Sequence, residues 1–168
     1  MKTRLDTYNN DWYNPGRSVF IRLAWLFVSV LFVQCSWNPV SSIRVMLLRL
    51  FGAHIGKNVT IKPGVHVKYP WFLQIGNSVW IGEKVWIDNL TQVTIGDHVC
   101  ISQGAFLLTG NHDYTRSTFD LMVKPIELRE GVWVGAKSIV CPGVICQSHA
   151  VLTAGSVARN ELPSYTIN

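Results

Sequence analysis

From Ile55 onward, aliphatic residues recur at every sixth position of the chain. The run is interrupted by two slips of two residues and by a longer break at 113–125. Its members are Ile55, Ile61, Val67, Leu73, Ile75, Ile81, Ile87, Ile95, Ile101, Leu107, Leu128, Val134, Val140, Cys146, Leu152 and Ala158. A period of six fits neither a helix nor an alternating strand, and it is typical of the hexapeptide repeat of a parallel β-helix. We therefore predict an all-β, parallel β-helix in which three hexads make one coil and the aliphatic side chains point inward.

Two further positions of the hexad are also selective. Glycine often follows the aliphatic residue, as in Ile75-Gly76 and Val134-Gly135, and we expect it to permit a tight corner, often with positive φ. The fifth position is usually small or β-branched, as at Val79 and Ala105. One narrow prism buries little apolar surface, and the free energy gained by that burial is opposed by the conformational entropy that the chain loses on folding. We therefore expect the protein to oligomerise, because association buries further surface.

The first 51 residues lack this repeat. Two apolar stretches, 18–34 and 41–51, predict an N-terminal helical segment, with Asn38-Pro39 between them. The apolar run 19–33 has only 15 residues and contains Arg22, whereas a membrane span needs about 20 apolar residues. Two interpretations remain: a helix that packs on the prism, and a helix that lies on a membrane surface. The short length favours the first, whereas arginines that flank or interrupt the apolar residues, at positions 17, 22, 44 and 49, are what the second would require. The expected organisation is thus a helical segment at 1–51, a β-helix at 52–163 and a truncated tail at 164–168.

Composition narrows the range of partners. Apolar residues make up 48% of the chain and charged residues 15%, which argues against disorder. The net charge of +5 suits a nucleic acid, an anionic membrane or a phosphate-bearing ligand, but no Lys/Arg-rich run or nucleic-acid motif is present, so we expect no nucleic-acid partner. None of the four cysteines forms a C-x-x-C pair, and we expect a reduced, cytoplasmic protein without zinc or disulfides.

His112 is the candidate catalytic residue. It occupies the sixth position of the hexad 107–112, where Trp80, Trp86 and Trp133 stand in other hexads. Because side chains alternate along a strand, we expect this position to face outward. The irregular loop 113–124 follows at once and is expected to leave the prism and cover the site. Function concentrates where loops leave a rigid scaffold, although an outward histidine is also an ordinary surface residue.

Several longer motifs extend this interpretation. They are "YNNDWYNPGRS" at 8–18, "LLRLFGAHIG" at 47–56, "IKPGVHVKYPW" at 61–71, "VWIDNLTQVTIGDHVCISQGAFLLTGNHDY" at 85–114 and "GVWVGAKSIVCPGV" at 131–144. Over nearly its whole length the chain resembles the colanic acid biosynthesis acetyltransferases of bacterial exopolysaccharide clusters, which are left-handed β-helix O-acetyltransferases. The resemblance implies acetyl-CoA as co-substrate, a sugar hydroxyl as acceptor, no metal, and a homotrimer with active sites between neighbouring prisms.

The resemblance also implies roles for single residues. His112 would act as general base, so that the acceptor oxygen attacks the thioester directly. The residues implied in acceptor binding are Asp88, Asn89, Asn111 and Asp113. For Asp88 and Asn89 a corner Asx turn is an equal alternative, and Asp113 either orients His112, contacts the sugar or starts the loop. The residues implied along the coenzyme are Trp133, Ala136, Ala154 and Arg159. Arg159-Asn160 stands where relatives often carry Thr-Lys, and relatives continue past the point where this chain stops, Asn168.

Two rival functions remain to be weighed. A zinc enzyme of the γ-carbonic-anhydrase kind needs three histidines, two of them five residues apart, and the five histidines show no such pair. A non-catalytic hexapeptide-repeat scaffold or binding protein is the alternative, because fold does not fix function. The cluster 111–113 beside a loop, together with Trp133, favours the enzyme. The resemblance further suggests peripheral contact with the cytoplasmic membrane face through the basic, apolar segment 17–51.

Overall fold

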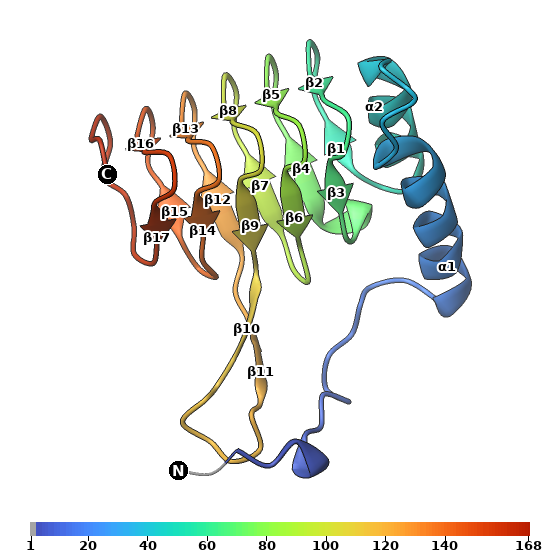
Figure 1. The fold of residues 1–168 in the computed structure, drawn as a ribbon, viewed down its shortest axis with the longest axis vertical. Coiled ribbons are helices and arrows are strands. Elements are labelled where there is room, and N and C mark those ends of the chain that lie inside the picture. The colour runs from blue at the N-terminus through green and yellow to red at the C-terminus, as the bar shows by residue number, and fades with distance from the viewer. Residues whose placement is uncertain (1–2) are drawn as a thin grey trace.

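The computed structural model describes residues 3–168 and shows a left-handed parallel β-helix with helices at one end (Figure 1). Each coil gives one short strand to each of three parallel sheets, here called A, B and C. Sheet A contains β1 (His54–Ile55), β4 (Leu73–Ile75), β7 (Val93–Ile95), β12 (Ile126–Leu128) and β15 (Ile145–Cys146). Sheet B contains β2 (Thr60–Ile61), β5 (Trp80–Ile81), β8 (Cys100–Ile101), β13 (Trp133–Val134) and β16 (Val151–Leu152). Sheet C contains β3 (His66–Val67), β6 (Trp86–Asp88), β9 (Phe106–Leu108), β14 (Ile139–Val140) and β17 (Val157–Ala158). The predicted fold class is confirmed.

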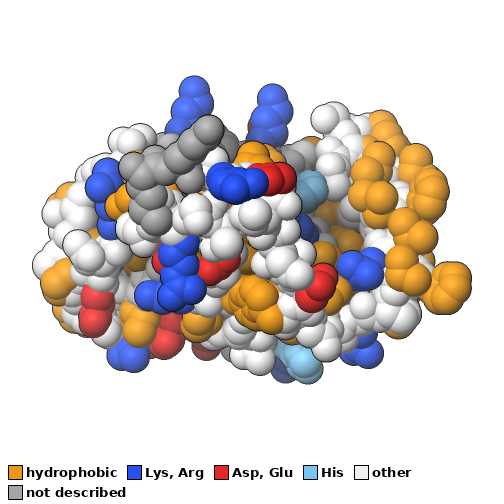
Figure 2. Space-filling view, turned by 90° about the horizontal axis from the view of Figure 1, so that it is seen from below, with side chains coloured by type: hydrophobic (Ala, Val, Ile, Leu, Met, Phe, Trp, Pro, Cys, Tyr) orange, Lys and Arg blue, Asp and Glu red, His pale blue; other side chains and the backbone are white. Residues whose placement is uncertain are grey.

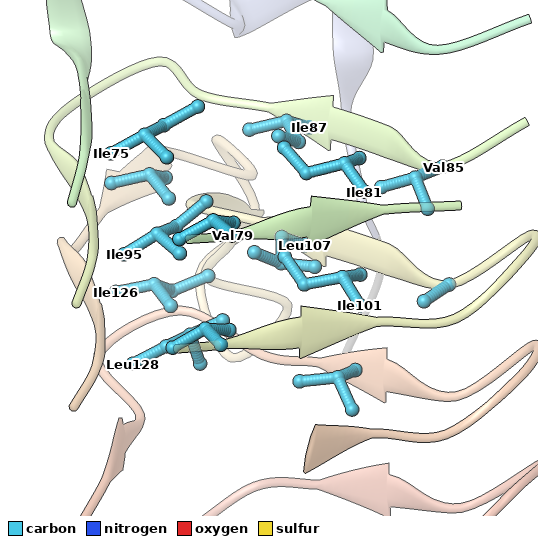
Figure 3. Packing of buried hydrophobic residues seen from close by; sticks show 14 of the residues in the cluster. Ile75, Val79, Ile81, Val85, Ile87, Ile95, Ile101, Leu107, Ile126 and Leu128 are labelled. Atoms are coloured by element: carbon cyan, nitrogen blue, oxygen red, sulfur yellow. The ribbon is translucent and has the colours of Figure 1, made fainter. Parts of the chain in front are cut away.

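The repeated aliphatic residues form the core of the prism. Equivalent positions of successive coils stack on one another, as Ile75, Ile95 and Leu128 do in sheet A (Figure 3). The slips in the six-residue period fall in sheet A, where β4, β7 and β12 have three residues and bury both ends, for example Leu73 and Ile75. A slip therefore marks a strand that is one pleat longer, with two inward side chains instead of one.

Glycine is required after the aliphatic residues for a different reason from the one expected. Gly76 and Gly135 do not have positive φ; instead, a Cβ on Gly135 would lie 2.6 Å from the backbone nitrogen of Ala154 in the next coil. Close approach of the coils is the reason for these glycines. The positive-φ corner falls two residues later, at hexad position four, where Gly104 (φ +68°) and Lys84 (φ +57°) stand.

The N-terminal helices close the end of the prism at β1–β3. They comprise α1 (Val19–Val28), a π-helical turn η2 (Ser29–Val33) and α2 (Ser41–Leu50). Of two 3₁₀ turns, η1 (Leu5–Thr7) lies away from this end, near the tip of the hairpin that residues 110–123 form (Figure 1), and η3 (Pro70–Phe72) lies within the prism. The Trp25 Nε1–H donates to the Val67 carbonyl at 3.0 Å, and the Ile61 amide donates to Ser41 Oγ at 2.8 Å. Arg44 is fully buried and donates to backbone carbonyls that include that of Val33. This arginine therefore holds the helices together rather than flanking an interfacial surface.

A β-hairpin projects from the prism as an arm. Its strands, β10 (Gly110–His112) and β11 (Leu121–Val123), pair antiparallel, with His112 opposite Leu121 (Figure 1). The excursion thus begins at Gly110 rather than near 113, and it is a regular hairpin rather than an irregular loop. His112 was expected to be an outward-facing residue of a regular hexad, with the chain leaving the prism only after it, and this is wrong, because His112 lies on the arm. The six-residue count did not reveal that the chain had already left the coil.

The last residues continue the stack. Isolated parallel bridges join Leu162 to Cys146 and Ile167 to Val151, and the Asn168 amide donates to the Val151 carbonyl at 2.9 Å. Segment 164–168, which was expected to be a tail, thus lies along β16, and Leu162 just before it lies along β15.

Candidate functional site

A polar cavity of about 680 Å³ lies where the arm, the N-terminal segment and the prism meet. The arm contributes His112, Gly110 and Leu121, and the prism contributes Lys68, Tyr69, Asp88 and Leu90. Arg22 of α1 and the N-terminal residues Tyr8, Asn10, Asp11, Tyr13 and Pro15 complete the lining. The cavity therefore depends on four parts of the chain that are far apart in sequence, and it places a histidine, two carboxylates and two cations around one space.

The imidazole of His112 contacts two aromatic rings, and one of its nitrogens has a backbone partner. The Phe119 ring stacks on it with centroids 4.3 Å apart and planes 5° from parallel, and the Tyr8 ring lies 5.6 Å away at a tilt. Nδ1 lies 2.9 Å from the Phe119 carbonyl oxygen. A carbonyl can only accept a hydrogen bond, so in the neutral ring Nδ1 carries the proton and Nε2 keeps its lone pair. This arrangement suits a general base that acts through Nε2.

Asp88 and Asn89 diverge in the structure. Asp88 lines the cavity and pairs with Lys68, with 2.9 Å between Oδ1 and Nζ. Asn89 is fully buried; its amide group accepts from the Tyr69 amide at 3.0 Å and donates to the Tyr69 carbonyl at 2.7 Å. Both ends of Asn89 are therefore used to fix the neighbouring corner, and the structure contradicts its assignment to acceptor binding. Of this pair, only Asp88 faces the space beside His112.

Asn111 and Asp113 also fail to face the cavity. Asn111 alternates with His112 on β10 and lines a separate hollow of about 270 Å³ on the other side of the arm. Asp113 accepts hydrogen bonds from the Thr115 amide and hydroxyl, which lower the pKa of its carboxyl below the ordinary value. Asp113 thus starts the turn of the arm, and the orienting partner of His112 is the Phe119 carbonyl instead. A carbonyl partner leaves no signal in the residue types of the sequence.

The N-terminal segment is the part of the site that the sequence did not reveal. The Arg4 amide donates to the Ser117 carbonyl at 2.8 Å, which ties the segment to the arm. The Tyr13 hydroxyl donates to the Leu90 carbonyl at 2.6 Å, and burial raises the pKa of this phenol well above its usual range. Tyr13 therefore stays protonated and holds the segment against the prism. Its signal was present in the aromatic and polar motif at 8–18.

The residues implied along the coenzyme lie on other edges of the prism. Trp133 is half exposed on the outer face of sheet B, and its indole N–H donates to Ser102 Oγ at 2.9 Å. Ala136 and Ala154 lie in successive corners between sheets B and C, where the Gly155 amide donates to the Ala136 carbonyl at 2.9 Å. Arg159 lies beyond β17 and lines the hollow that contains Asn111. Trp133 is not among the residues that line the cavity around His112.

Neither a metal-binding cluster nor a membrane-spanning helix is present in residues 3–168. No group of three or more His, Cys, Asp or Glu side chains in residues 3–168 is placed to hold a metal ion. None of the helices in that range has the length and apolar character needed to cross a membrane.

Similarity to known proteins is extensive, although no protein-family model matches the chain. The sequence is 36% identical over 157 residues to the "Putative colanic acid biosynthesis acetyltransferase WcaF" of Escherichia coli (strain K12), covering 92% of this chain and 85% of that one. The fold is similar to a hexapeptide-repeat acetyltransferase from Vibrio cholerae O1 biovar eltor complexed with acetyl-CoA (24% identity, TM-score 0.77, 88% and 81% covered). It is also similar to a galactoside acetyltransferase in complex with coenzyme A (24% identity, TM-score 0.77, 88% and 75% covered).

Proposed function

The chain belongs to the hexapeptide-repeat acetyltransferase family of the colanic acid biosynthesis protein WcaF, and on this premise we propose that it acetylates a sugar hydroxyl in exopolysaccharide synthesis. Acetyl-CoA is the acetyl donor, as the complexes of the two structural relatives suggest. The observation that carries the proposal is the position of His112, which lines a cavity with polar and charged groups that suit a carbohydrate and whose Nδ1 contact leaves the lone pair on Nε2.

His112 serves as the general base in this proposal. Nε2 takes the proton of the acceptor hydroxyl while the oxygen forms a C–O bond to the acetyl carbonyl carbon. The C–S bond of the thioester breaks, and the proton passes to the departing sulfur, so the products are an acetylated sugar and coenzyme A. Asp88, oriented by Lys68, accepts hydrogen bonds from neighbouring hydroxyls of the sugar.

Trp133, Ala136 and Ala154 are the residues that would hold the coenzyme. The half-exposed indole offers an apolar face, and the two alanines keep the corners between sheets B and C free of bulky side chains. In a single chain, Arg159 does not lie at these corners. Its role toward a phosphate therefore stays a prediction.

A homotrimer would complete the site. The arm with His112 and the face with Trp133 lie on opposite sides of the prism in Figure 1, so one chain does not bring base and coenzyme together. A neighbouring copy that packs its sheet B edge against the arm supplies the missing half. Sedimentation equilibrium measures this directly, and an active monomer would exclude it.

Contact with the cytoplasmic face of a membrane is the remaining part of the proposal. The helices expose Phe20 (79%), Phe27 (67%) and Leu50 (75%), and Figure 2 shows hydrophobic side chains gathered along this edge. No acidic residue stands between Asp11 and Glu83, whereas seven Lys or Arg residues do. A surface that exposes apolar side chains and carries basic but no acidic residues suits an anionic bilayer.

Vesicle sedimentation tests the membrane contact. Vesicles with anionic phosphatidylglycerol should bind the protein, and vesicles of phosphatidylcholine alone should bind it far less. Phe20→Glu should weaken binding, whereas Ile167→Glu, at an equally exposed position (78%) at the other end of the prism, should not. Equal binding of the two variants would show that the helical edge is not the contact.

Thiol release from acetyl-CoA, measured against a panel of bacterial sugars and lipid-linked oligosaccharides, tests the reaction itself. His112→Ala should lower acceptor-dependent release by about 10²-fold or more, as loss of a general base does. His54→Ala is the matched control, because His54 is exposed and does not line the cavity. If His112→Ala releases thiol as fast as the wild type, His112 is not the general base. If no acceptor in the panel stimulates release by the wild type, the proposed acceptor class is wrong.

A further inference from the structure

A separate cavity of about 620 Å³ lies between α2 and the first coil of the prism. Its walls come from one face of α2 and from the chain at 56–60, which leads from β1 into β2; the helix residues are Ser41, Ser42, Val45, Met46 and Arg49. None of these residues lines the cavity that contains His112 or the hollow that contains Asn111. The acetyl transfer proposed above makes no use of this space.

The Arg49 guanidinium is fixed where it lines this cavity. Its Nε donates to the Ile55 carbonyl at 3.2 Å, and its Nη2 donates to the carbonyls of Ile55 and Gly56 at 2.8 and 2.7 Å. These bonds leave Nη1 as the free edge of the group. Lys57 is the second cation of the cavity, and within residues 3–168 neither cation forms an ion pair. A guanidinium that is held in place without a carboxylate binds an anion at little cost in side-chain entropy.

The remaining polar groups of the cavity are neutral donors. They are the hydroxyls of Ser42 and Thr60 and the amide of Asn58, and within residues 3–168 no acidic side chain lines the space. A phosphate accepts hydrogen bonds from every one of these groups and from both cations. The cavity is larger than a phosphate ion, so it also has room for hydroxyl groups attached to the phosphate.

An apolar strip of α2 borders the cavity. Ile43, Met46 and Leu50 are exposed, and their spacing of three and four residues places them on one face of the helix. Met46 also lines the cavity itself. The strip lies at the same end of the prism as the exposed Phe20 and Phe27 of α1, which belong to the surface proposed to contact the bilayer.

From this combination of a fixed cationic cavity and an apolar border we propose that the cavity binds the headgroup of an anionic phospholipid. The phosphate bonds to Arg49 Nη1 and to Lys57, hydroxyls of the headgroup bond to Ser42, and the acyl chains lie over Met46 and Leu50 toward the bilayer. The assignment rests on the proposed membrane contact and gives that contact a specific ligand in addition to diffuse electrostatic attraction.

A phospholipid suits this site better than a soluble anion or an acidic polymer does. A soluble phosphate would leave the apolar strip beside it in water, whereas the acyl chains of a lipid cover that strip. Arg49 and Lys57 stand at one place rather than in a row, so the cavity fits a single phosphate group and not a chain of charges.

Vesicle sedimentation with charge-matched variants separates a specific site from diffuse attraction. Lys57 is exposed, so Lys57→Gln should fold, and it should weaken binding to phosphatidylglycerol vesicles by about tenfold or more, because a hydrogen bond to a charged group is lost. Lys62→Gln is the matched control. Lys62 belongs to the same coil but does not line the cavity, and its ammonium lies 4.8 Å from the Trp80 ring centroid.

Diffuse attraction would weigh these two lysines alike, since each contributes through its charge near the surface. Lys62→Gln should therefore bind the vesicles several-fold more tightly than Lys57→Gln, and thermal unfolding midpoints should show that both variants fold. Equal binding by the two variants would overturn the headgroup site and leave the membrane contact standing.

A short-chain lipid tests the cavity without any bilayer. In titration calorimetry below the concentration at which it forms micelles, dihexanoyl-phosphatidylglycerol should bind about tenfold or more tighter than inorganic phosphate, because its acyl chains bury apolar surface. Met46→Ser should reduce that difference, since Met46 is exposed beside the cavity and the variant keeps both cations. Equal affinity for the lipid and for inorganic phosphate would overturn the lipid assignment. Binding of the short-chain lipid without vesicle binding would instead refute the membrane contact and retain the site.

Discussion

Phe119 provides a direct test of how the arm positions the candidate base. Its ring stacks on the His112 imidazole, and its backbone carbonyl accepts from Nδ1, so one residue sets both the plane and the tautomer. Phe119→Ala removes the ring and leaves the carbonyl. Because alanine also has a Cβ, the left-handed backbone at this position (φ +52°) is equally strained in both proteins.

The expected magnitude follows from the stack. An aromatic pair of this geometry is worth about 0.5–1.5 kcal/mol, and each 1.36 kcal/mol corresponds to tenfold in rate. Phe119→Ala should therefore lower kcat by roughly twofold to tenfold, well short of the 10²-fold or greater loss expected for His112→Ala. The KM for acetyl-CoA should stay unchanged, because Phe119 positions the base and does not hold the coenzyme.

Two measurements check the reasoning. Thiol release gives kcat and KM for Phe119→Ala and for Phe119→Tyr, which keeps the stacked ring and should behave as the wild type. Nitrogen-15 NMR of the imidazole reports the tautomer without any acceptor and should show the neutral ring protonated at Nδ1. A neutral ring protonated at Nε2, or a Phe119→Ala enzyme with wild-type kcat, would refute the positioning role.

Three further predictions concern stability and are measured by denaturant unfolding. Leu107→Ala should cost about 2–5 kcal/mol because this side chain is fully buried, and a loss below about 1 kcal/mol would contradict the stacked core. Gly135→Ala should cost about 1–3 kcal/mol by forcing its Cβ against the Ala154 backbone, whereas Gly155→Ala, with open space but φ +75°, should cost about 1–2 kcal/mol. Burial lowers the pKa of His66, so the unfolded chain binds the proton more readily and stability should fall as pH drops below about 6.5. His66→Gln should flatten that decline, and an unchanged pH dependence would show that His66 does not contribute to it.

The sequence predicted the prism well because its cause is local and repeated. Each inward aliphatic residue, from Ile61 to Leu152, is selected by the same environment in every coil, so the period of six reports the fold directly. The helical segment near the N-terminus was predicted by its apolar stretches for the same kind of reason. The start of the arm at Gly110 was missed, because Leu107, Leu108 and Thr109 still follow the hexad while the chain leaves the coil.

The candidate site was predicted only in part, because side chains that meet there come from separate repeats and from the N-terminal segment. His112 and Asp88 were identified, and the structure places both in one cavity. Asn89 was placed among the acceptor-binding residues, but its side chain is buried and bonds to the backbone of Tyr69 in the neighbouring coil, which is neither of the two roles weighed from the sequence. Tyr13 and Arg22 were not assigned to the site. The motif at 8–18 was recognised, but its residue types do not say that a segment 90 or more residues upstream folds across His112.

The sequence by itself determined the coil, its inward positions and the presence of a histidine where the repeat ends, because hexad burial is a property of neighbours along the chain. Only the tertiary structure decided which way that histidine faces, which carbonyl fixes its tautomer and which cations lie beside it. Those features depend on the hairpin pairing of β10 with β11 and on helix α1 packing against β3. Contacts of this kind join residues distant in sequence, so no periodic pattern within the chain records them.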